Sequence, residues 1–579
     1  MHPQPWGGAP IFLSFNASLR TSYQGAGQSI RAPADISQQD YNHNLLQSTF
    51  DEPAYHAGFG SPCKRVSPFY QVSRYLGPGL GGQGLKDPGS TEDKTTRTMP
   101  PLKRTNSYIL ADLDFTLRRQ FNKPSFRPQQ REIIQAAVDG NDVFVQAATS
   151  FGKSLCFQLP AVVDQGITIV VSPLLSLMMN QVEALQAAGI NASSLNSNTP
   201  GIEKDRIYKD LQTGHPLTRL LYVTPELCAL DRFRDRLRIV HEQKELARIA
   251  IDEAHCISEW GHDFRKDFKR LSWFRESFPD VPIMCLTATA NIQVRRDVLS
   301  TLGLDEKSDR LKIFTMTAYR PNLHLEIRFT SDQDDRRLDD FLRWIKGVHA
   351  RRADEPRKSE LHPAERVDNV PGIIYTISRD ECESLASSLR SEGIGAQPFH
   401  AKLSKEVKEQ TLAKWVGNEP GYDIIVATTA FGMGIDKLNV RFVVHWRLPK
   451  SFEGYYQEAG RAGRDGNAAY CFLYYSREDR DRVSSLIIRD GQQSGNASNF
   501  QARASSLQKL AEYCESVKAC RHAMICQYFG EPQIPKCDYA CDWHKDARDL
   551  SMRRLRGLAS EEFVSTQREE GRYDVDWYD

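Results

Sequence analysis

The sequence predicts an α/β protein with two successive parallel-sheet lobes followed by a small helical module. Two series of short apolar, β-branched segments alternate with segments of helix length, one over about residues 110–305 and one from about residue 320. This alternation is typical of parallel strands joined by crossover helices. The other supporting observation is a group of five cysteines within 28 positions near the C-terminus. Clustering of this kind indicates a metal site in the final module.

The composition is that of an ordinary globular protein and excludes several classes. The chain has 579 residues, with 40% hydrophobic and 26% charged, which is enough for several domains with real cores. Lys+Arg 75 against Asp+Glu 74 leaves a net charge of +1, so overall charge indicates no particular partner. No apolar run approaches the roughly 18 residues of a membrane span, and the first residues do not resemble a signal peptide. Twelve cysteines are too few for a disulfide scaffold.

Five regions are predicted along the chain. Residues 1–108 are rich in Gly, Ser, Pro, Gln and Asn and show neither helix nor strand periodicity, so we expect them to be disordered. The aromatic stretch at 50–77 within them is either a partner-binding segment or part of a solvated tail. The other predicted regions are a first lobe at 109–318, a second lobe at 319–490, a cysteine-containing helical module at 491–548 and a tail at 549–579.

Each lobe is predicted from its apolar strand segments. The first lobe contains candidate strands at residues 142–149, 167–173, 219–225, 248–254 and 282–289. The second lobe contains candidate strands at residues 324–329, 371–378, 395–401, 423–429, 440–446 and 468–475. A charged segment at 331–370 is interpreted as a helix and a solvated loop. Apolar segments like these candidate strands are expected where a strand is covered on both faces of its sheet.

A phosphate-binding loop is predicted directly after the first strand, where residues 147–154 read AATSFGKS. This is the P-loop pattern with alanine in place of the first glycine. Backbone N–H groups of such a loop bind phosphates, its lysine reaches the β- and γ-phosphates, and its hydroxyl binds Mg²⁺. The residues predicted to bind nucleotide are Thr149, Ser150, Phe151, Gly152, Lys153 and Ser154, with Ser154 also a magnesium ligand.

Two adjacent carboxylates, Asp252 and Glu253, follow another strand of the first lobe. The carboxyl edge of a parallel sheet is where such proteins bind ligands. We therefore predict that Asp252 binds Mg²⁺ and that Glu253 is the base that polarises the attacking water. A helix-capping pair is the alternative, but it does not explain the position of both residues at the end of a buried strand.

The second lobe offers the segment QEAGRAGRDG, in which Gln457, Arg461 and Arg464 are predicted to be catalytic. Two arginines three positions apart share one face of a helix and can contact developing phosphate charge. A solvated basic turn is the alternative. Because the first lobe has no arginine so placed, the sequence predicts catalysis across a cleft between the lobes.

Together these segments resemble the RecQ family of superfamily-two DNA helicases, over residues 110–548. The matching segments, in order, are FRPQQ (126–130), SPLLSLMMNQV (172–182), TPE (224–226), DEAH (252–255), CISEWGHDFRKDF (256–268), TATA (287–290), TTAFGMGIDK (428–437) and QEAGRAGRDG (457–466). The resemblance implies two RecA-like lobes that bind ATP, with Arg127 and Gln130 contacting adenine. It also implies that Thr287 and Ala288 couple hydrolysis to lobe movement.

The resemblance further assigns a DNA-sensing loop, with Trp260, His262, Phe264 and Arg265 coupling single-stranded DNA to the ATP site. Aromatic faces that stack on bases, together with arginine, suit this task. Ordinary core packing is the alternative for Trp260 and Phe264.

In the cysteine cluster, the resemblance implies a zinc site formed by Cys520, Cys537, Cys541 and His544, with histidine where the family usually has a fourth cysteine. The alternative is a set of scattered reduced cysteines, and Cys514 and Cys526 are interpreted as core thiols.

Two departures from the family pattern stand out. The family usually carries Thr-Gly-Gly-Gly-Lys-Ser in its phosphate loop, whereas Ser150 and Phe151 replace two glycines here, so we expect altered ATP affinity and turnover. The chain also has few residues after the cysteine cluster, which resembles the short form with a helicase core and a zinc module only.

The function implied is an ATP-dependent 3′-to-5′ DNA helicase that acts on single-stranded and forked DNA, in repair and recombination in the nucleus. One alternative is an RNA helicase or remodeller of the same superfamily. Gln457 and Thr287 argue against it, because RNA-directed relatives usually begin these two motifs with histidine and serine. A catalytically weakened DNA-binding relative is the other alternative. The presence of Lys153, Asp252, Glu253 and Arg464 argues against it.

Overall fold

The computed structural model describes residues 112–258, 265–331, 336–361, 365–429, 431–432, 435, 437–494, 497–533, 536–538 and 540–564. The region predicted to be disordered, 1–108, lies outside the described residues. So do Trp260, His262 and Phe264 of the predicted DNA-sensing loop. None of the helices in the described ranges combines the length and apolar character that crossing a bilayer requires.

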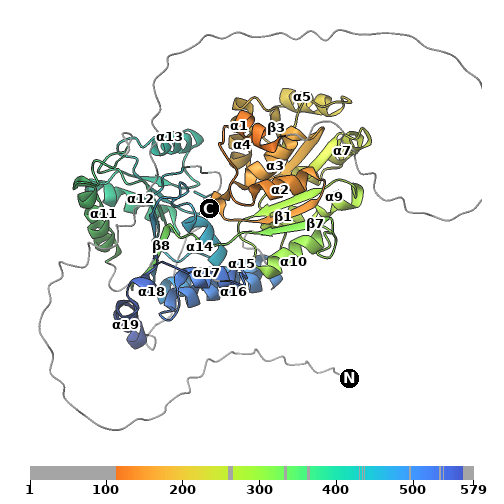
Figure 1. Cartoon of the computed structure of the whole chain (residues 1–579). Helices are drawn as coiled ribbons and strands as arrows, with labels where there is room; N and C mark the ends of the chain where they lie inside the picture. The colour runs from red at the N-terminus through yellow and green to blue at the C-terminus, as the bar shows by residue number, and fades with distance from the viewer. Residues whose placement is uncertain are drawn as a thin grey trace, which may run out of the picture. The chain divides into compact units, whose positions relative to one another are not determined.

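The first lobe is a seven-stranded parallel sheet in the order β3-β4-β2-β5-β6-β1-β7 (Figure 1). Its strands are β1 Asp142–Gln146, β2 Ile167–Val171, β3 Ala192–Leu195, β4 Leu220–Val223, β5 Leu246–Ile251, β6 Ile283–Thr287 and β7 Leu311–Thr315. Its helices are α1 Leu113–Phe121, α2 Gln130–Val138, α3 Lys153–Val163, α4 Leu175–Ala187, α5 Gly201–Leu211, α6 Pro225–Cys228, α7 Asp231–Glu242, α8 Lys266–Lys269, α9 Ser272–Ser277 and α10 Ile292–Thr301.

The second lobe is a six-stranded parallel sheet in the order β10-β11-β9-β12-β13-β8. Its strands are β8 Leu323–Phe329, β9 Gly372–Tyr375, β10 Ala396–Phe399, β11 Ile424–Ala427, β12 Phe442–His445 and β13 Ala469–Tyr475. Its helices are α11 Arg337–Ala353, α12 Arg379–Ser391, α13 Lys405–Val416 and α14 Phe452–Ala459. The predicted fold class, two parallel-sheet lobes followed by a helical module, is confirmed.

Both sheets are covered on two faces, which explains their apolar strands. On β1, Val143 and Val145 enter one core of the first lobe and Phe144 enters the other. On β9, Ile373 and Ile374 divide between two cores of the second lobe in the same way. Successive side chains of a strand point to opposite faces, so a strand buried on both faces has no polar alternation.

Two strands of the first lobe have no counterpart among the predicted ones. These are β3 and β7, which lie at the two edges of the sheet. The segment of β3 reads ASSL, and on β7 Lys312 and Ile313 are exposed. Neither segment is a continuous hydrophobic run, because β3 holds two serines and β7 holds Lys312.

The C-terminal helices form a module that shares the core of the second lobe. They are α15 Arg477–Ser494, α16 Ala497–Glu515, α17 Arg521–Tyr528, α18 Asp542–Lys545 and α19 Ala547–Val564. Leu510 and Phe529 of this module pack in the same buried cluster as Leu473 on β13. At the sheet edge, β8 is paired further: Leu325 donates its N–H to Ala540 O at 3.1 Å and forms a parallel bridge with Cys541.

The predicted tail at 549–579 begins as a helix. α19 runs to Val564 and buries Leu550 and Leu558. It packs closely on β8, since a Cβ added at Gly557 would lie 2.4 Å from Phe329 Cβ. In Figure 1, α18 and α19 lie beside β8. The helix has a mixed, basic sequence in which Leu550 and Leu558 are buried, whereas Met552 and Leu555 stay exposed.

Candidate active site and metal cluster

The phosphate loop lies between β1 and α3 and is built around Gly152. Residues Thr149–Phe151 form a short 3₁₀ turn, and Gly152 has a φ of +87°, a left-handed conformation that favours glycine. A Cβ at this position would lie 2.8 Å from Gln130 Nε2. The loop backbone is therefore packed directly against the start of α2, with its N–H groups at the N-terminus of the buried helix α3, where anions bind.

Gln130 connects the predicted adenine-binding segment to this loop. Its Oε1 accepts a hydrogen bond from Arg127 N at 2.8 Å, and its Nε2 donates to Phe151 O at 2.8 Å. Phe151, which replaces a family glycine, packs against the core around β1 and α3. The Phe151 side chain, which departs from the family pattern, therefore anchors the phosphate loop in the core of the first lobe.

Lys153, Asp252 and Glu253 lie together at the carboxyl ends of β1 and β5, and all three are buried. Lys153 Nζ donates to Ala147 O at 3.0 Å. Burial lowers the pKa of Lys153, whereas the charges of Glu253 and Asp252 act in the opposite direction. Burial and then the charge of Glu253 raise the pKa of Asp252. This is a concentrated, poorly solvated group of charges that a bound cation and polyphosphate would balance.

Glu253 also connects the nucleotide site to the TATA segment. Its backbone φ is +50°, an uncommon conformation for a residue with a side chain. Its Oε2 lies 3.4 Å from His255 Nδ1, and that nitrogen lies 3.0 Å from Thr287 Oγ1. Thr287 Oγ1 in turn accepts from Thr289 N at 3.1 Å. A continuous polar path therefore joins the predicted base to the predicted coupling motif.

The arginine segment does not lie on a helical face as predicted. Helix α14 ends at Ala459, so buried Gln457 is helical, whereas Arg461 and Arg464 follow in a turn in which Gly463 has a φ of +55°. The turn forms because Arg461 N and Ala462 N bond back to Glu458 O and Ala459 O, which shortens the helical pattern. The prediction that the two arginines share a helix face is wrong.

The two lobes nevertheless meet at this turn. Thr149 Oγ1 of the phosphate loop donates to Gly460 O at 3.3 Å. The charge of Arg464 acts on Lys153 and further lowers its pKa, and Arg464 Nη1 donates to Ile435 O at 2.6 Å. Lys153, Asp252, Glu253 and the arginine turn therefore form one site, to which both lobes contribute.

Of the predicted DNA-sensing residues, only Arg265 is among those described. It lies just before α8, and its Nη1 donates to Pro173 O, within the segment SPLLSLMMNQV, at 2.8 Å. The roles of this loop stay predictions.

The four predicted zinc ligands come together from three separate segments. The ligand atoms of Cys520, Cys537, Cys541 and His544 all lie within 4.8 Å of one another. The Cys541 sulfur lies 3.8 Å from that of Cys520 and 4.0 Å from that of Cys537. A tetrahedron with Zn–S bonds of about 2.3 Å has edges of about 3.8 Å. Three sulfurs and one imidazole nitrogen therefore fit a closed structural zinc site.

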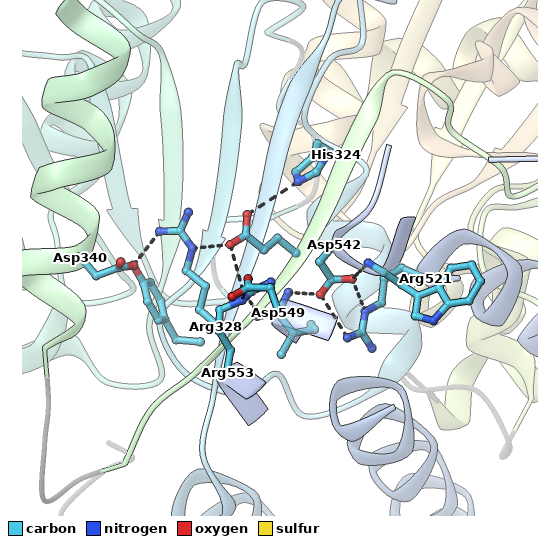
Figure 2. A network of polar contacts seen from close by, with 11 residues as sticks. His324, Arg328, Asp340, Arg521, Asp542, Asp549 and Arg553 are labelled. Carbon is cyan, nitrogen blue, oxygen red and sulfur yellow. Dashed lines mark hydrogen bonds and ion pairs between the residues drawn. The ribbon is translucent and has the colours of Figure 1, made fainter. Parts of the chain in front are cut away.

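A buried ion pair attaches this cluster to the second lobe. Arg521 and Asp542, each next to a cysteine of the cluster, are both fully buried and bond at 2.9 Å and 3.1 Å. Asp542 Oδ2 also accepts from Ile327 N of β8 at 3.0 Å. Figure 2 shows Arg521 and Asp542 side by side. Beside it, Arg553 of α19 bonds Asp549 and Glu326, and Glu326 bonds Arg328.

Two further residues at the site, His522 and Arg320, are marked by no sequence pattern. His522 Nδ1 lies 3.4 Å from Cys537 Sγ, and Arg320, between the lobes, donates to carbonyl groups of the arginine turn. No local pattern marks either residue, because their partners are more than ten positions away in the chain.

Comparisons with known proteins agree with this architecture. The DEAD/DEAH box helicase family matches residues 127–298, the helicase conserved C-terminal domain matches 358–466, and the RecQ zinc-binding domain matches 477–545. The chain is 42% identical over 414 residues to the RecQ-like DNA helicase BLM of Xenopus laevis, covering 71% of this chain and 28% of that protein. It is 40% identical over 424 residues to the ATP-dependent DNA helicase Q-like 2 of Arabidopsis thaliana, covering 73% and 55%.

A solved structure of lower sequence similarity supports the fold alone. The crystal structure of the DUF1998 helicase MrfA bound to DNA matches with a TM-score of 0.50 and 16% identity, over 64% of this chain and 49% of that one.

The fold and the site define a two-lobe helicase core with a P-loop in the first lobe and an arginine turn in the second. With its zinc-binding module, the chain belongs to the RecQ family of DNA helicases. It spans between about a quarter and about two thirds of the length of the curated relatives it matches.

Proposed function

We propose that this chain is an ATP-dependent DNA helicase that couples ATP hydrolysis to translocation on single-stranded DNA and to duplex unwinding. The observation that carries the proposal is the joint site, in which Thr149 of the phosphate loop contacts Gly460 of the arginine turn. A nucleotide bound between the lobes would contact both of them, so its hydrolysis would change the contacts between the lobes and their relative position.

The proposed roles follow from the charges. Lys153 neutralises the β- and γ-phosphates, Glu253 accepts the proton of the attacking water, and Arg461 and Arg464 stabilise the charge that develops in the transition state. Mg²⁺, held by Ser154 and Asp252, supplies further screening of phosphate charge when bound. Gln457 positions the nucleotide from the second lobe, and Arg127 and Gln130 contact its base.

The finer assignments rest on the relatives and on the family resemblance. Proteins named DNA helicases among the relatives support DNA as the substrate, and the family resemblance supports 3′-to-5′ movement on single-stranded and forked DNA. Action in repair and recombination in the nucleus is part of the same proposal. The zinc module stabilises the fold and helps present DNA, and it takes no part in the chemistry.

The test is a comparison of ATP hydrolysis without nucleic acid, with single-stranded DNA and with single-stranded RNA. We expect strong stimulation by DNA and little by RNA. Unwinding of a fork is then compared for duplexes with only a 3′ or only a 5′ single-stranded arm, and the 3′ arm is expected to be required. Stimulation by RNA alone would favour the RNA helicase alternative, and no hydrolysis in any condition would favour the catalytically weakened relative.

Replacing Gly152 with alanine is expected to weaken ATP binding by about tenfold. The left-handed φ costs an L-residue roughly 1–2 kcal/mol, and the new Cβ would meet Gln130 Nε2 at 2.8 Å. The matched control is Gly140→Ala, between α2 and β1, where φ is +79° but nothing lies within 4 Å of an added Cβ. Titration with a fluorescent ATP analogue measures the affinity of both variants. Equal affinities would show that the loop geometry at Gly152 does not matter for nucleotide binding.

A further inference from the structure

The chain passes between the lobes through one short linker, residues 316–322, between the end of β7 and the start of β8. On the side of the first lobe it is tied to β1, since Met316 N donates to Gln146 O at 2.8 Å. Any change in the relative position of the lobes must be accommodated in this segment. What holds the linker therefore influences how the two halves of the site meet.

The helical module contacts the linker through the turn that ends α17, residues 528–531. The Glu531 carboxylate accepts hydrogen bonds from Thr317 Oγ1, at 2.7 Å, and from Ala318 N. Gly530, with a φ of +77°, turns the chain so that Glu531 N bonds Cys526 O at 3.0 Å. A carboxylate that receives both a hydroxyl and a backbone N–H makes charge-assisted hydrogen bonds, which are stronger than neutral ones.

The same turn touches both lobes. A Cβ at Gly530 would lie 2.9 Å from Ile292 of α10 in the first lobe. Tyr528 OH donates to Glu453 of α14 in the second lobe. Glu531 therefore binds the linker from a turn that also contacts α10 of the first lobe and α14 of the second lobe.

Two further contacts hold the next linker residues. Tyr319 OH donates to Lys536 O at 3.0 Å, and His522 Nε2 lies 3.1 Å from Arg320 O. The rings of Tyr319 and His522 meet edge to face, with centroids 5.1 Å apart. The module thus contacts four consecutive linker residues, from Thr317 to Arg320.

Arg320 connects the linker to the predicted ATP site. Its guanidinium donates to Gly460 O at 3.3 Å and to the carbonyls of Ala462 and Gly463, both at 3.0 Å. These carbonyls flank Arg461 in the arginine turn, and Gly460 O also accepts from Thr149 of the phosphate loop. The path from Glu531 to the site consists of the linker backbone and one forked side chain.

We infer that Glu531 is a positioning residue for ATP hydrolysis: it holds the interlobe linker so that Arg320 presents the arginine turn to the phosphate loop. The inference rests on the proposed function, because the arginine turn matters only if ATP is hydrolysed there. The helical module then has a second task besides stability and DNA binding. It sets the geometry in which the lobes close.

The test is Glu531→Gln in the full chain, which keeps the side-chain size but removes the charge and one accepting oxygen. We expect kcat for DNA-stimulated ATP hydrolysis to fall by at least about fivefold, the lower end of typical couplings between sites. KM for ATP should change by less than about twofold, because the phosphate loop and α2 are untouched. Hydrogen exchange of residues 316–322 should become faster.

Two further variants follow the path. Thr317→Val removes one of the two donors to Glu531 and is expected to give a smaller fall of kcat with the same pattern. Arg320→Lys keeps the charge but loses the fork, and is expected to lower kcat at least as much as Glu531→Gln. The matched control is Glu512→Gln on α16, an exposed glutamate that bonds Gln508 and Lys509 of its own helix. It should behave as the wild type in every assay.

Zinc content and the melting temperature of each variant show that the fold is kept. If kcat and linker exchange in Glu531→Gln equal those of Glu512→Gln, the inference is wrong. It is also wrong if KM rises while kcat stays unchanged. Wild-type protein without DNA-stimulated hydrolysis would instead contradict the proposed function, and the two failures are therefore distinguished.

Discussion

Glu253→Gln is expected to lower the rate of ATP hydrolysis by at least about 100-fold while ATP still binds. General base catalysis typically contributes about 10²- to 10⁴-fold, and an amide cannot take the proton of the attacking water. Lys153→Ala should also abolish hydrolysis, but through loss of binding, since Lys153 is the cation predicted to meet the β- and γ-phosphates. Hydrolysis rates and binding of a fluorescent ATP analogue, measured on both variants, separate the two causes.

The control for this pair is Glu242→Gln at the exposed end of α7, outside the site. It should hydrolyse ATP at the wild-type rate. Wild-type hydrolysis in Glu253→Gln would show that another group activates the water. Unchanged ATP affinity in Lys153→Ala would show that the lysine acts only in the transition state.

The second large effect is expected from Cys537→Ser, which removes one thiolate of the predicted zinc site. Structural zinc contributes about 10–16 kcal/mol in small zinc-finger peptides, so loss of a ligand removes folding free energy directly. Cys520, Cys537 and Cys541 also belong to the buried cluster that includes Ile373 and Leu473 of the second lobe. We therefore expect zinc well below one equivalent and a lower melting temperature of the second lobe as well as of the module.

Elemental analysis and thermal unfolding of the purified variants decide this prediction. Cys514→Ser is the matched control: Cys514 is fully buried near the cluster but is not one of the four grouped ligands. It should keep one equivalent of zinc and lose only the stability expected for a polar atom in an apolar core. Full zinc content in both Cys537→Ser and His544→Ala would show that the ligand set is wrong.

The strands of the first lobe that were predicted differ from the two that were not in how many apolar residues they contain. β1, β2 and β5 lie inside the sheet of the first lobe and are buried on both faces, so their segments are mostly apolar, with buried Arg248 on β5 as an exception. β3 and β7 lie at the edges and have fewer apolar residues: β7 carries exposed Lys312, and β3 reads ASSL although three of its four residues are buried. A short segment with few apolar residues is hard to recognise as a strand from the sequence pattern.

The same limit applies to the arginine turn and to the C-terminal helix. The spacing of Arg461 and Arg464 fits one helix face, but α14 ends at Ala459 through bonds that the pattern does not contain. α19 has no continuous apolar stripe in its sequence, and it is ordered by its packing on β8. In the turn after α14, Gly463 N also donates to Val440 O at 2.9 Å, so in both cases contacts with distant segments fix the local conformation.

The amino-acid pattern alone was sufficient for the two-lobe fold, the phosphate loop and the paired carboxylates, whereas the four grouped zinc ligands came from the family resemblance. These features are carried by short segments whose chemistry is local, such as a glycine and a lysine at a helix start. Only the tertiary structure shows the contact between Thr149 and Gly460 and the core that the module shares with the second lobe. The same is true of the hydrogen bond between Glu531 and Thr317 of the linker. These contacts join residues more than two hundred positions apart or across separate elements, and a hydrogen bond between such residues leaves no periodicity in the chain.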